Sequence, residues 1–179
     1  MPVRLRHHQF LLCAILAALA VVIGYIFLLI PNIEFITAAI FISGFLTGRT
    51  QGALIGLVAE FFFSFFNPYG PPTPPLLAAQ LLAMAVTGFA GGSIGRSNWL
   101  QQPPRYTALL FGATGLVLTL IYDVLTNLSI AWMLTDGSAN KIAGVLIAGM
   151  GFAVLHLLSN TVAFALAVPL MMRRLVKIL

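Results

Sequence analysis

Six apolar segments, separated by short polar breaks, make up most of this sequence. A helix that crosses a bilayer has about 17–25 residues, and the lengths of these segments are close to that range. Apolar residues are 60% of the chain and charged residues 7%, whereas a soluble domain has about 25% charged residues. We therefore predict an all-α membrane protein with six transmembrane helices in a single domain, residues 1–179. The predicted segments are Phe10–Ile30, Glu34–Thr47, Gly52–Phe66, Leu76–Ile94, Thr107–Leu128 and Ile142–Pro169.

The second and third segments are short, and the sequence GRTQG (residues 48–52) joins them. One long helix through this stretch would leave Arg49 and Gln51 in lipid, at a high free-energy cost. The sequence therefore favours a helical hairpin. Other breaks are predicted at Pro31–Asn32, at the proline-rich loop 67–75 and around Asp136.

The basic residues predict the orientation of the chain. Cytoplasmic loops of membrane proteins carry an excess of Lys and Arg. With six spans and a cytoplasmic N-terminus, the outer side receives only Lys141, and the inner side receives eight of the nine basic residues, Arg4, Arg6, Arg49, Arg96, Arg105, Arg173, Arg174 and Lys177. We therefore expect both termini in the cytoplasm. The first apolar run continues to Ile30, beyond the about 7–15 residues of a signal-peptide core, so we expect an uncleaved first helix.

Several function classes lack their sequence signals. The basic residues lie at segment ends rather than on one face, which argues against a nucleic-acid partner. The one cysteine, Cys13, allows no intrachain disulfide. The chain has no phosphate-binding glycine loop, no metalloprotease motif and no nucleophile elbow. We expect no enzyme activity, no cofactor and no metal, and ATP, if it is used, would be hydrolysed by a partner.

Polar residues inside the apolar segments are the candidate binding residues, because such residues usually face a cavity or a partner. Glu60, Ser64 and Asn67 form one stripe on the third segment, at spacings of four and three residues. The others are Glu34, Gln80, Asp123, Asn127, His156 and Asn160. Most of these positions converge on the outer half of the predicted bundle, which predicts a substrate cavity open to the outside, with loop 67–75 across its mouth. The alternative is that Glu60 pairs with His156 or Gln80 only to stabilise the fold.

Ala14 and Ala18, four residues apart on the first segment, predict a shallow groove that a neighbouring helix can approach closely. The spacing alone leaves internal packing open as the alternative, since Gly44/Gly48, Gly52/Gly56 and Gly88/Gly92 repeat it.

Two stretches carry a family resemblance. They are IPNIEFITAAIFISGFLTGRTQGALIGLVAEFFFSFFNPYG (residues 30–70) and PPLLAAQLLAMAVTGFAGGSIG (residues 74–95). With the A-x-x-x-A motif of the first helix, they resemble the substrate-binding S component of an energy-coupling factor (ECF) transporter. This resemblance implies a six-helix bundle in a bacterial or archaeal plasma membrane, a vitamin-like substrate, a membrane coupling subunit that contacts Ala14 and Ala18, and two ATPase subunits.

The substrate itself is not fixed by the sequence. The PNIE stretch resembles cobalamin-type S components, whereas the acidic residues would suit a cationic ligand such as thiamine. Two alternatives come from other classes: an MreD-like scaffold of the cell-shape machinery, and a proton-coupled carrier or intramembrane enzyme that uses Glu60, Asp123 and His156.

Overall fold

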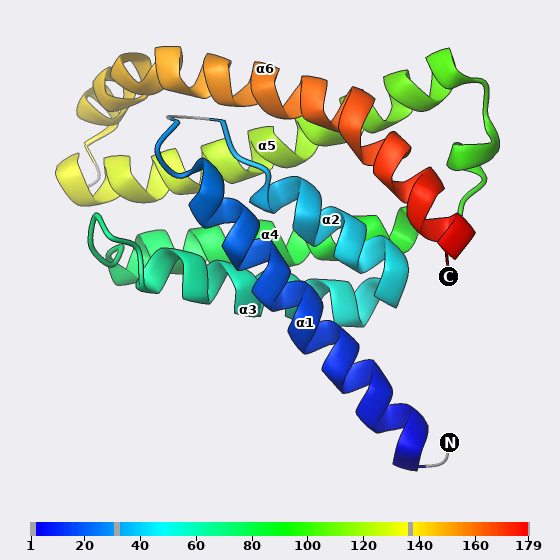
Figure 1. Cartoon of the computed structure of the whole chain (residues 1–179). Helices are drawn as coiled ribbons and strands as arrows, with labels where there is room; N and C mark the ends of the chain where they lie inside the picture. Colours follow the sequence, from blue (N-terminus) through cyan, green and yellow to red (C-terminus); the bar gives the residue numbers. More distant parts are fainter. Residues whose placement is uncertain (1–2, 31–32, 136–137, 179) are drawn as a thin grey trace.

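The computed structural model of the chain describes residues 3–30, 33–135 and 138–178. These residues form six α-helices and a short 3-10 helix, η1 (Trp99–Gln101). The helices are α1 (Val3–Phe27), α2 (Ile36–Thr47), α3 (Arg49–Phe65), α4 (Pro74–Ile94), α5 (Pro104–Thr135) and α6 (Ala139–Ile178). Figure 1 shows α5 and α6 side by side above α3 and α4, with α2 between these pairs and α1 crossing in front.

Each predicted segment contains a helix, so the all-α prediction is confirmed. The predicted ends of the fifth and sixth segments are wrong, because α5 runs on from Leu128 to Thr135 and α6 runs through Pro169 to Ile178. Residues 170–178 are mostly Leu, Met, Arg and Lys, which are good helix formers, and one proline can be tolerated within a membrane helix. The breaks predicted at Pro31–Asn32 and at Asp136 lie outside the described residues.

Four of the described helices are long and apolar enough to cross a membrane, by length and composition: His7–Phe27, Pro74–Ile94, Pro104–Thr135 and Ala139–Lys177. The apolar helix α2 has 12 residues, which span about 18 Å, less than the about 30 Å hydrocarbon core. Large apolar side chains such as Phe10 and Ile147 are exposed on the outer helices, as expected of surfaces that face lipid.

The hairpin predicted around residues 48–52 is confirmed, and its turn is narrower than expected. Only Gly48 separates α2 from α3. Its φ is +98°, a conformation that glycine adopts without steric cost. Arg49 therefore begins α3, and its guanidinium carbon lies 5.7 Å from the centre of the Phe89 ring.

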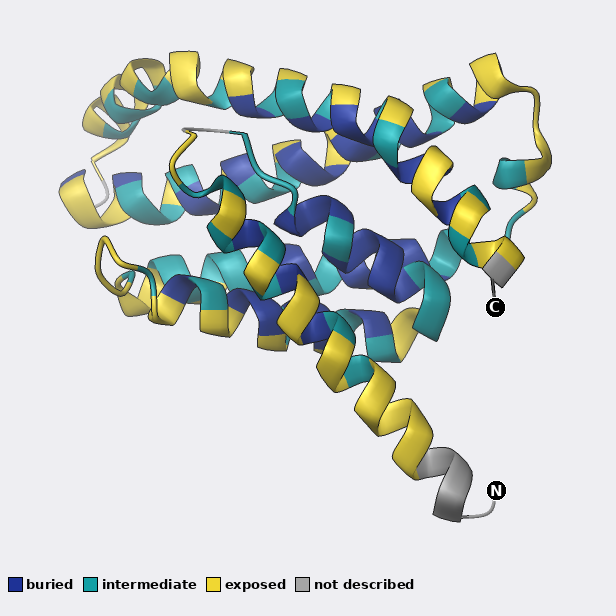
Figure 2. Ribbon diagram, viewed as in Figure 1, coloured by how far each residue is buried: buried dark blue, intermediate teal, exposed yellow. Residues whose placement is uncertain are grey.

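The short helix α2 is the centre of the core, as its dark colour in Figure 2 shows. One face, with Ala38, Phe41 and Ile42, packs on α5 and α6, where it meets Phe111 and Phe164. Its other face belongs to a second apolar cluster, formed with α1, α3 and α4 by Ala17, Ala20, Ile36, Ile40, Ile55, Ala59 and Met84. A helix that is apolar all round is expected to be buried in this way.

Glycines let α2, α3 and α4 approach backbone to backbone. A Cβ atom on Gly44 would lie 2.0 Å from the Gly88 carbonyl oxygen, and one on Gly56 would lie 2.1 Å from that of Met84. Such small-residue contacts are typical of helices packed in membranes. They make α2, α3 and α4 one tightly packed unit.

Candidate functional site

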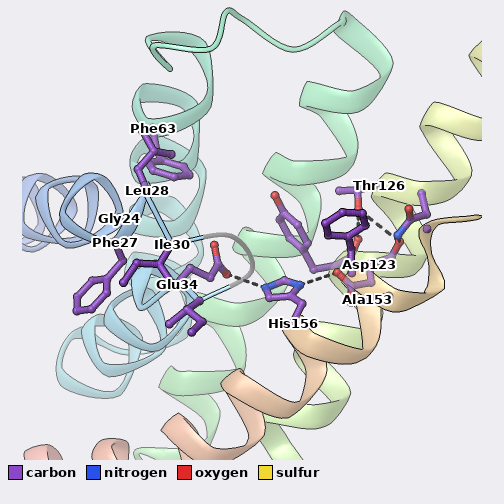
Figure 3. A pocket seen from close by; sticks show the side chains of 15 residues that line it. Gly24, Phe27, Leu28, Ile30, Glu34, Phe63, Asp123, Thr126, Ala153 and His156 are labelled. Carbon is purple, nitrogen blue, oxygen red and sulfur yellow. Dashed lines mark hydrogen bonds and ion pairs between the residues drawn. The ribbon is translucent and has the colours of Figure 1, made fainter.

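A pocket of about 380 Å³ lies where the end of α1 and the start of α2 face α5 and α6. This volume is within the range of about 300–1,000 Å³ that small-molecule pockets occupy. One wall is formed by the end of α1 with residues 28, 30, 33 and 34, the other wall by α5 and α6, and Phe63 of α3 closes one side (Figure 3). The lining residues are Gly24, Phe27, Leu28, Ile30, Ile33, Glu34, Phe63, Tyr122, Asp123, Thr126, Asn127, Gly149, Phe152, Ala153 and His156.

The polar centre of the pocket is His156, which lies between two carboxylates (Figure 3). Its Nδ1 atom is 2.7 Å from Asp123 Oδ1, and its Nε2 atom is 3.2 Å from Glu34 Oε1. When both ring nitrogens carry a proton, each donates to one carboxylate. Three elements, the segment before α2, α5 and α6, are joined through this one side chain.

One further hydrogen bond holds the Glu34 carboxylate, and another joins the Asn127 side chain to the backbone of Asp123. Thr37 Oγ1 donates to Glu34 Oε1, and the Asn127 amide donates to the Asp123 carbonyl oxygen at 2.7 Å. Asp123 Oδ2 is buried and has no partner among the described residues. Since a buried acceptor without a partner is costly, Asp123 is ready to accept a hydrogen bond from a ligand.

Four of the predicted binding residues line this pocket: Glu34, Asp123, Asn127 and His156. Glu60, Ser64, Gln80 and Asn160 are outside its lining. Asn67 lies in the loop after α3, where its side chain accepts a hydrogen bond from the Tyr69 amide. The loop 67–75, predicted to lie across the mouth of the cavity, contributes no lining residue, whereas Leu28, Ile30 and Ile33, between α1 and α2, line the pocket.

The predicted residues outside the pocket form a polar layer behind Tyr122. Glu60 is fully buried and accepts a hydrogen bond of 2.7 Å from Ser64. Gln80 Nε2 donates to the Tyr122 hydroxyl at 3.2 Å, and Tyr122 lies beside Glu60. Asn160 lies next to Glu34, although its amide makes no well-formed hydrogen bond with a described residue.

The aromatic part of the pocket was not predicted. Phe27, Phe63, Tyr122 and Phe152 come from α1, α3, α5 and α6. The Tyr122 ring meets the His156 ring edge-on, at 5.9 Å between centres. Asp123 stands out as an ionisable residue in an apolar segment, whereas its neighbour Tyr122 does not. The hydroxyl group of Tyr122 was the available signal. Within the described residues, no group of three or more His, Cys, Asp or Glu side chains is arranged to hold a metal ion.

The two alanines of the predicted docking motif lie on the outward side of α1. Ala14 and Ala18 are exposed, whereas Ala17 and Ala20 point into the core. Ala14 and Ala18 line a shallow apolar groove between α1 and α3, with Val58 on its far side. Their exposure argues against internal packing within this chain.

Comparison with known protein families gives a match that covers nearly the whole chain. The family model of the ECF-type riboflavin transporter S component matches residues 4–172. No curated protein gives a significant match to the sequence.

Proposed function

The chain belongs to the ECF-type riboflavin transporter S-component family, and from this premise we propose that it binds riboflavin, or a closely related flavin, in the pocket beside His156. As a member of this family, the chain is the substrate-binding subunit of an ECF transporter and a multi-pass plasma-membrane protein. The family match over residues 4–172 is the observation that carries the proposal.

The chemistry of the pocket suits a flavin. Riboflavin joins a flat tricyclic ring to a chain of hydroxyl groups. The Phe27, Phe63 and Phe152 rings offer apolar surface to the ring system, since aromatic groups favour stacked and edge-on contacts. Glu34 and Asp123 offer carboxylate oxygens, which accept hydrogen bonds from hydroxyl groups.

We assign the predicted residues three roles. Glu34, Asp123, Asn127 and His156 contact the ligand. Glu60, Ser64, Gln80 and Asn160 support the wall formed by Tyr122, and Asn67 shapes the loop after α3.

The binding test uses the purified protein and flavin fluorescence. We expect riboflavin fluorescence to be quenched on binding, with no competition from thiamine or cobalamin. Asp123→Asn keeps the shape and removes the charge, so it should weaken binding roughly ten- to hundredfold, the equivalent of a charged hydrogen bond of about 1.5–3 kcal/mol. Gln102→Asn, on the loop before α5 and outside the lining, is the matched control and should bind normally. The proposal fails if riboflavin does not bind and another vitamin co-purifies with the protein.

Membership of this family also bears on the two alternatives from other classes. An MreD-like scaffold needs no ligand pocket, and a carrier or enzyme would act without ATPase partners. S components bind the transported substrate, and ATP hydrolysis belongs to partner subunits. Transport by this chain alone, without a coupling subunit or ATPases, would favour the carrier.

We propose six membrane crossings with both termini in the cytoplasm, a topology supported by eight of the nine basic residues. In a Cys13→Ala background, which removes the one native cysteine, Thr73→Cys should react with an impermeant thiol reagent added to intact cells. Ser97→Cys should react only after permeabilisation. The reverse pattern would exclude this orientation.

Docking on the coupling subunit is proposed to use the exposed groove at Ala14 and Ala18. We expect Ala14→Leu with Ala18→Leu to preserve riboflavin binding and to abolish co-purification with the coupling subunit, because larger side chains would hold its helix away. The control, Ile15→Leu with Leu19→Ile, changes exposed neighbours at constant volume and should assemble normally. If Ala14→Leu with Ala18→Leu loses both flavin binding and folding, the groove packs internally.

A further inference from the structure

Glu60 is a buried carboxylate that the pocket does not use. It lies within α3, has 0% exposure and is absent from the pocket lining. Its Oε1 atom accepts the Ser64 hydrogen bond, and its Oε2 atom has no partner among the described residues. Gln80 Oε1, on the facing helix α4, is also buried without a partner.

No basic side chain among the described residues forms an ion pair with Glu60. The ion pairs found in the described interior are those of His156, and both go to other carboxylates. Helix α4 has no titratable residue. The titratable groups on the other elements around Glu60 are Tyr25 of α1, which donates to α3 carbonyls, Glu34, Tyr122, Asp123 and His156. Glu34 and Asp123 are themselves acids, so they add negative charge.

A buried carboxylate without a counter-charge is strongly unfavourable, above all at membrane depth. The free oxygens of Glu60 and Gln80 both need a positive centre or a hydrogen. We propose that Glu60 binds one monovalent cation, a proton or Na⁺, with Ser64, Gln80 and Tyr122 as its oxygen neighbours. A divalent ion would call for further carboxylates, and Glu60 has none as a direct partner in the described structure.

The first test measures the melting temperature of ligand-free protein in detergent, so it does not depend on riboflavin binding. Sodium chloride replaces choline chloride at constant ionic strength, and pH is then varied in choline alone. A ligand that binds only the folded state raises stability with its concentration. Bound Na⁺ should therefore raise the melting temperature by about 2–4 °C or more. A bound proton should instead give stability that falls as pH rises, because the unfolded chain releases the proton first.

The matched variants identify the site. Glu60→Gln keeps the size and removes the charge, so it should abolish a Na⁺ dependence, or reduce a pH dependence to the part that the other titratable groups contribute. Thr87→Val removes another buried hydroxyl, one already bonded to Ala83 within its own helix, and should keep the dependence. Equal responses of wild type and Glu60→Gln to both Na⁺ and pH would overturn the proposal.

A second measurement uses the wild-type protein, in case Glu60→Gln does not fold. Dicyclohexylcarbodiimide is an apolar reagent that modifies protonated carboxyl groups, and mass spectrometry locates the product. Modification of Glu60 that Na⁺ blocks indicates a sodium site. Modification that is indifferent to Na⁺ indicates a bound proton. Absence of modification at Glu60 in choline, at mildly acidic pH, would overturn the proposal.

Discussion

Replacement of Gly88 by alanine should abolish stable folding of the helix bundle. A Cβ atom at this position would lie 1.9 Å from the Gly52 carbonyl oxygen and 2.4 Å from the carbonyl carbon. Both atoms belong to the backbone of α3, so no side chain can rotate away and the two helices must separate. Overpacking commonly costs about 1–3 kcal/mol and can cost more, and we expect a loss of at least about 3 kcal/mol here.

The matched control is Gly151→Ala on α6, where nothing lies within 4 Å of the added Cβ atom. Alanine favours a helix over glycine by about 1 kcal/mol, so this variant should melt at or slightly above the wild-type temperature. Thermal unfolding in detergent, with monodispersity checked by gel filtration, compares the two. Equal melting temperatures for Gly88→Ala and wild type would show that α3 and α4 do not pack as closely as described.

The helices could be predicted from the sequence because nearly all of its apolar residues lie in segments set off by Gly, Pro and Asn. The ends of α5 and α6 were predicted too early, because the predicted segments stop at Leu128 and Pro169 although residues 129–135 and 170–178 are still mostly apolar. The central position of α2 in the bundle could not be predicted from the sequence. Its 12 residues look like a short span, and only the tertiary contacts show that both of its faces are covered.

The polar half of the candidate site could be found in the sequence because an ionisable residue in an apolar segment is rare. Glu34, Asp123 and His156 stand out for this reason, although their pairing depends on how α2, α5 and α6 pack. The aromatic half could not be found in the same way. The chain has 14 phenylalanines, and nothing in the local sequence separates Phe63, which faces the pocket, from the exposed Phe62.

The position of loop 67–75 could not be predicted for a different reason. Several prolines in loop 67–75 indicate a stiff segment, and stiffness suits a rim. The loop instead meets the end of α5, where Thr73 Oγ1 lies 3.0 Å from Met133 Sδ. Stiffness can be predicted from proline, whereas the surface against which a loop packs depends on the helices at its ends.

Replacement of His156 by alanine should remove ligand binding and lower stability together. The imidazole is the group that separates Glu34 from Asp123 and bonds to both. Without it, two carboxylates face each other across a buried gap. Breaking a buried ion pair by removing one partner costs about 3–5 kcal/mol. If ligand binding loses the same amount of free energy, riboflavin affinity should fall at least about a hundredfold.

Two further variants separate charge from shape. His156→Gln can donate from its amide to one carboxylate, and we expect an intermediate melting temperature and affinity. Glu34→Gln combined with His156→Ala removes one of the two facing charges. It should recover part of the stability that His156→Ala loses, a coupling that a double-mutant cycle measures. Affinity and melting temperature are measured on the same preparations. If His156→Ala binds riboflavin and melts as the wild type does, the imidazole neither holds the two carboxylates nor shapes the pocket.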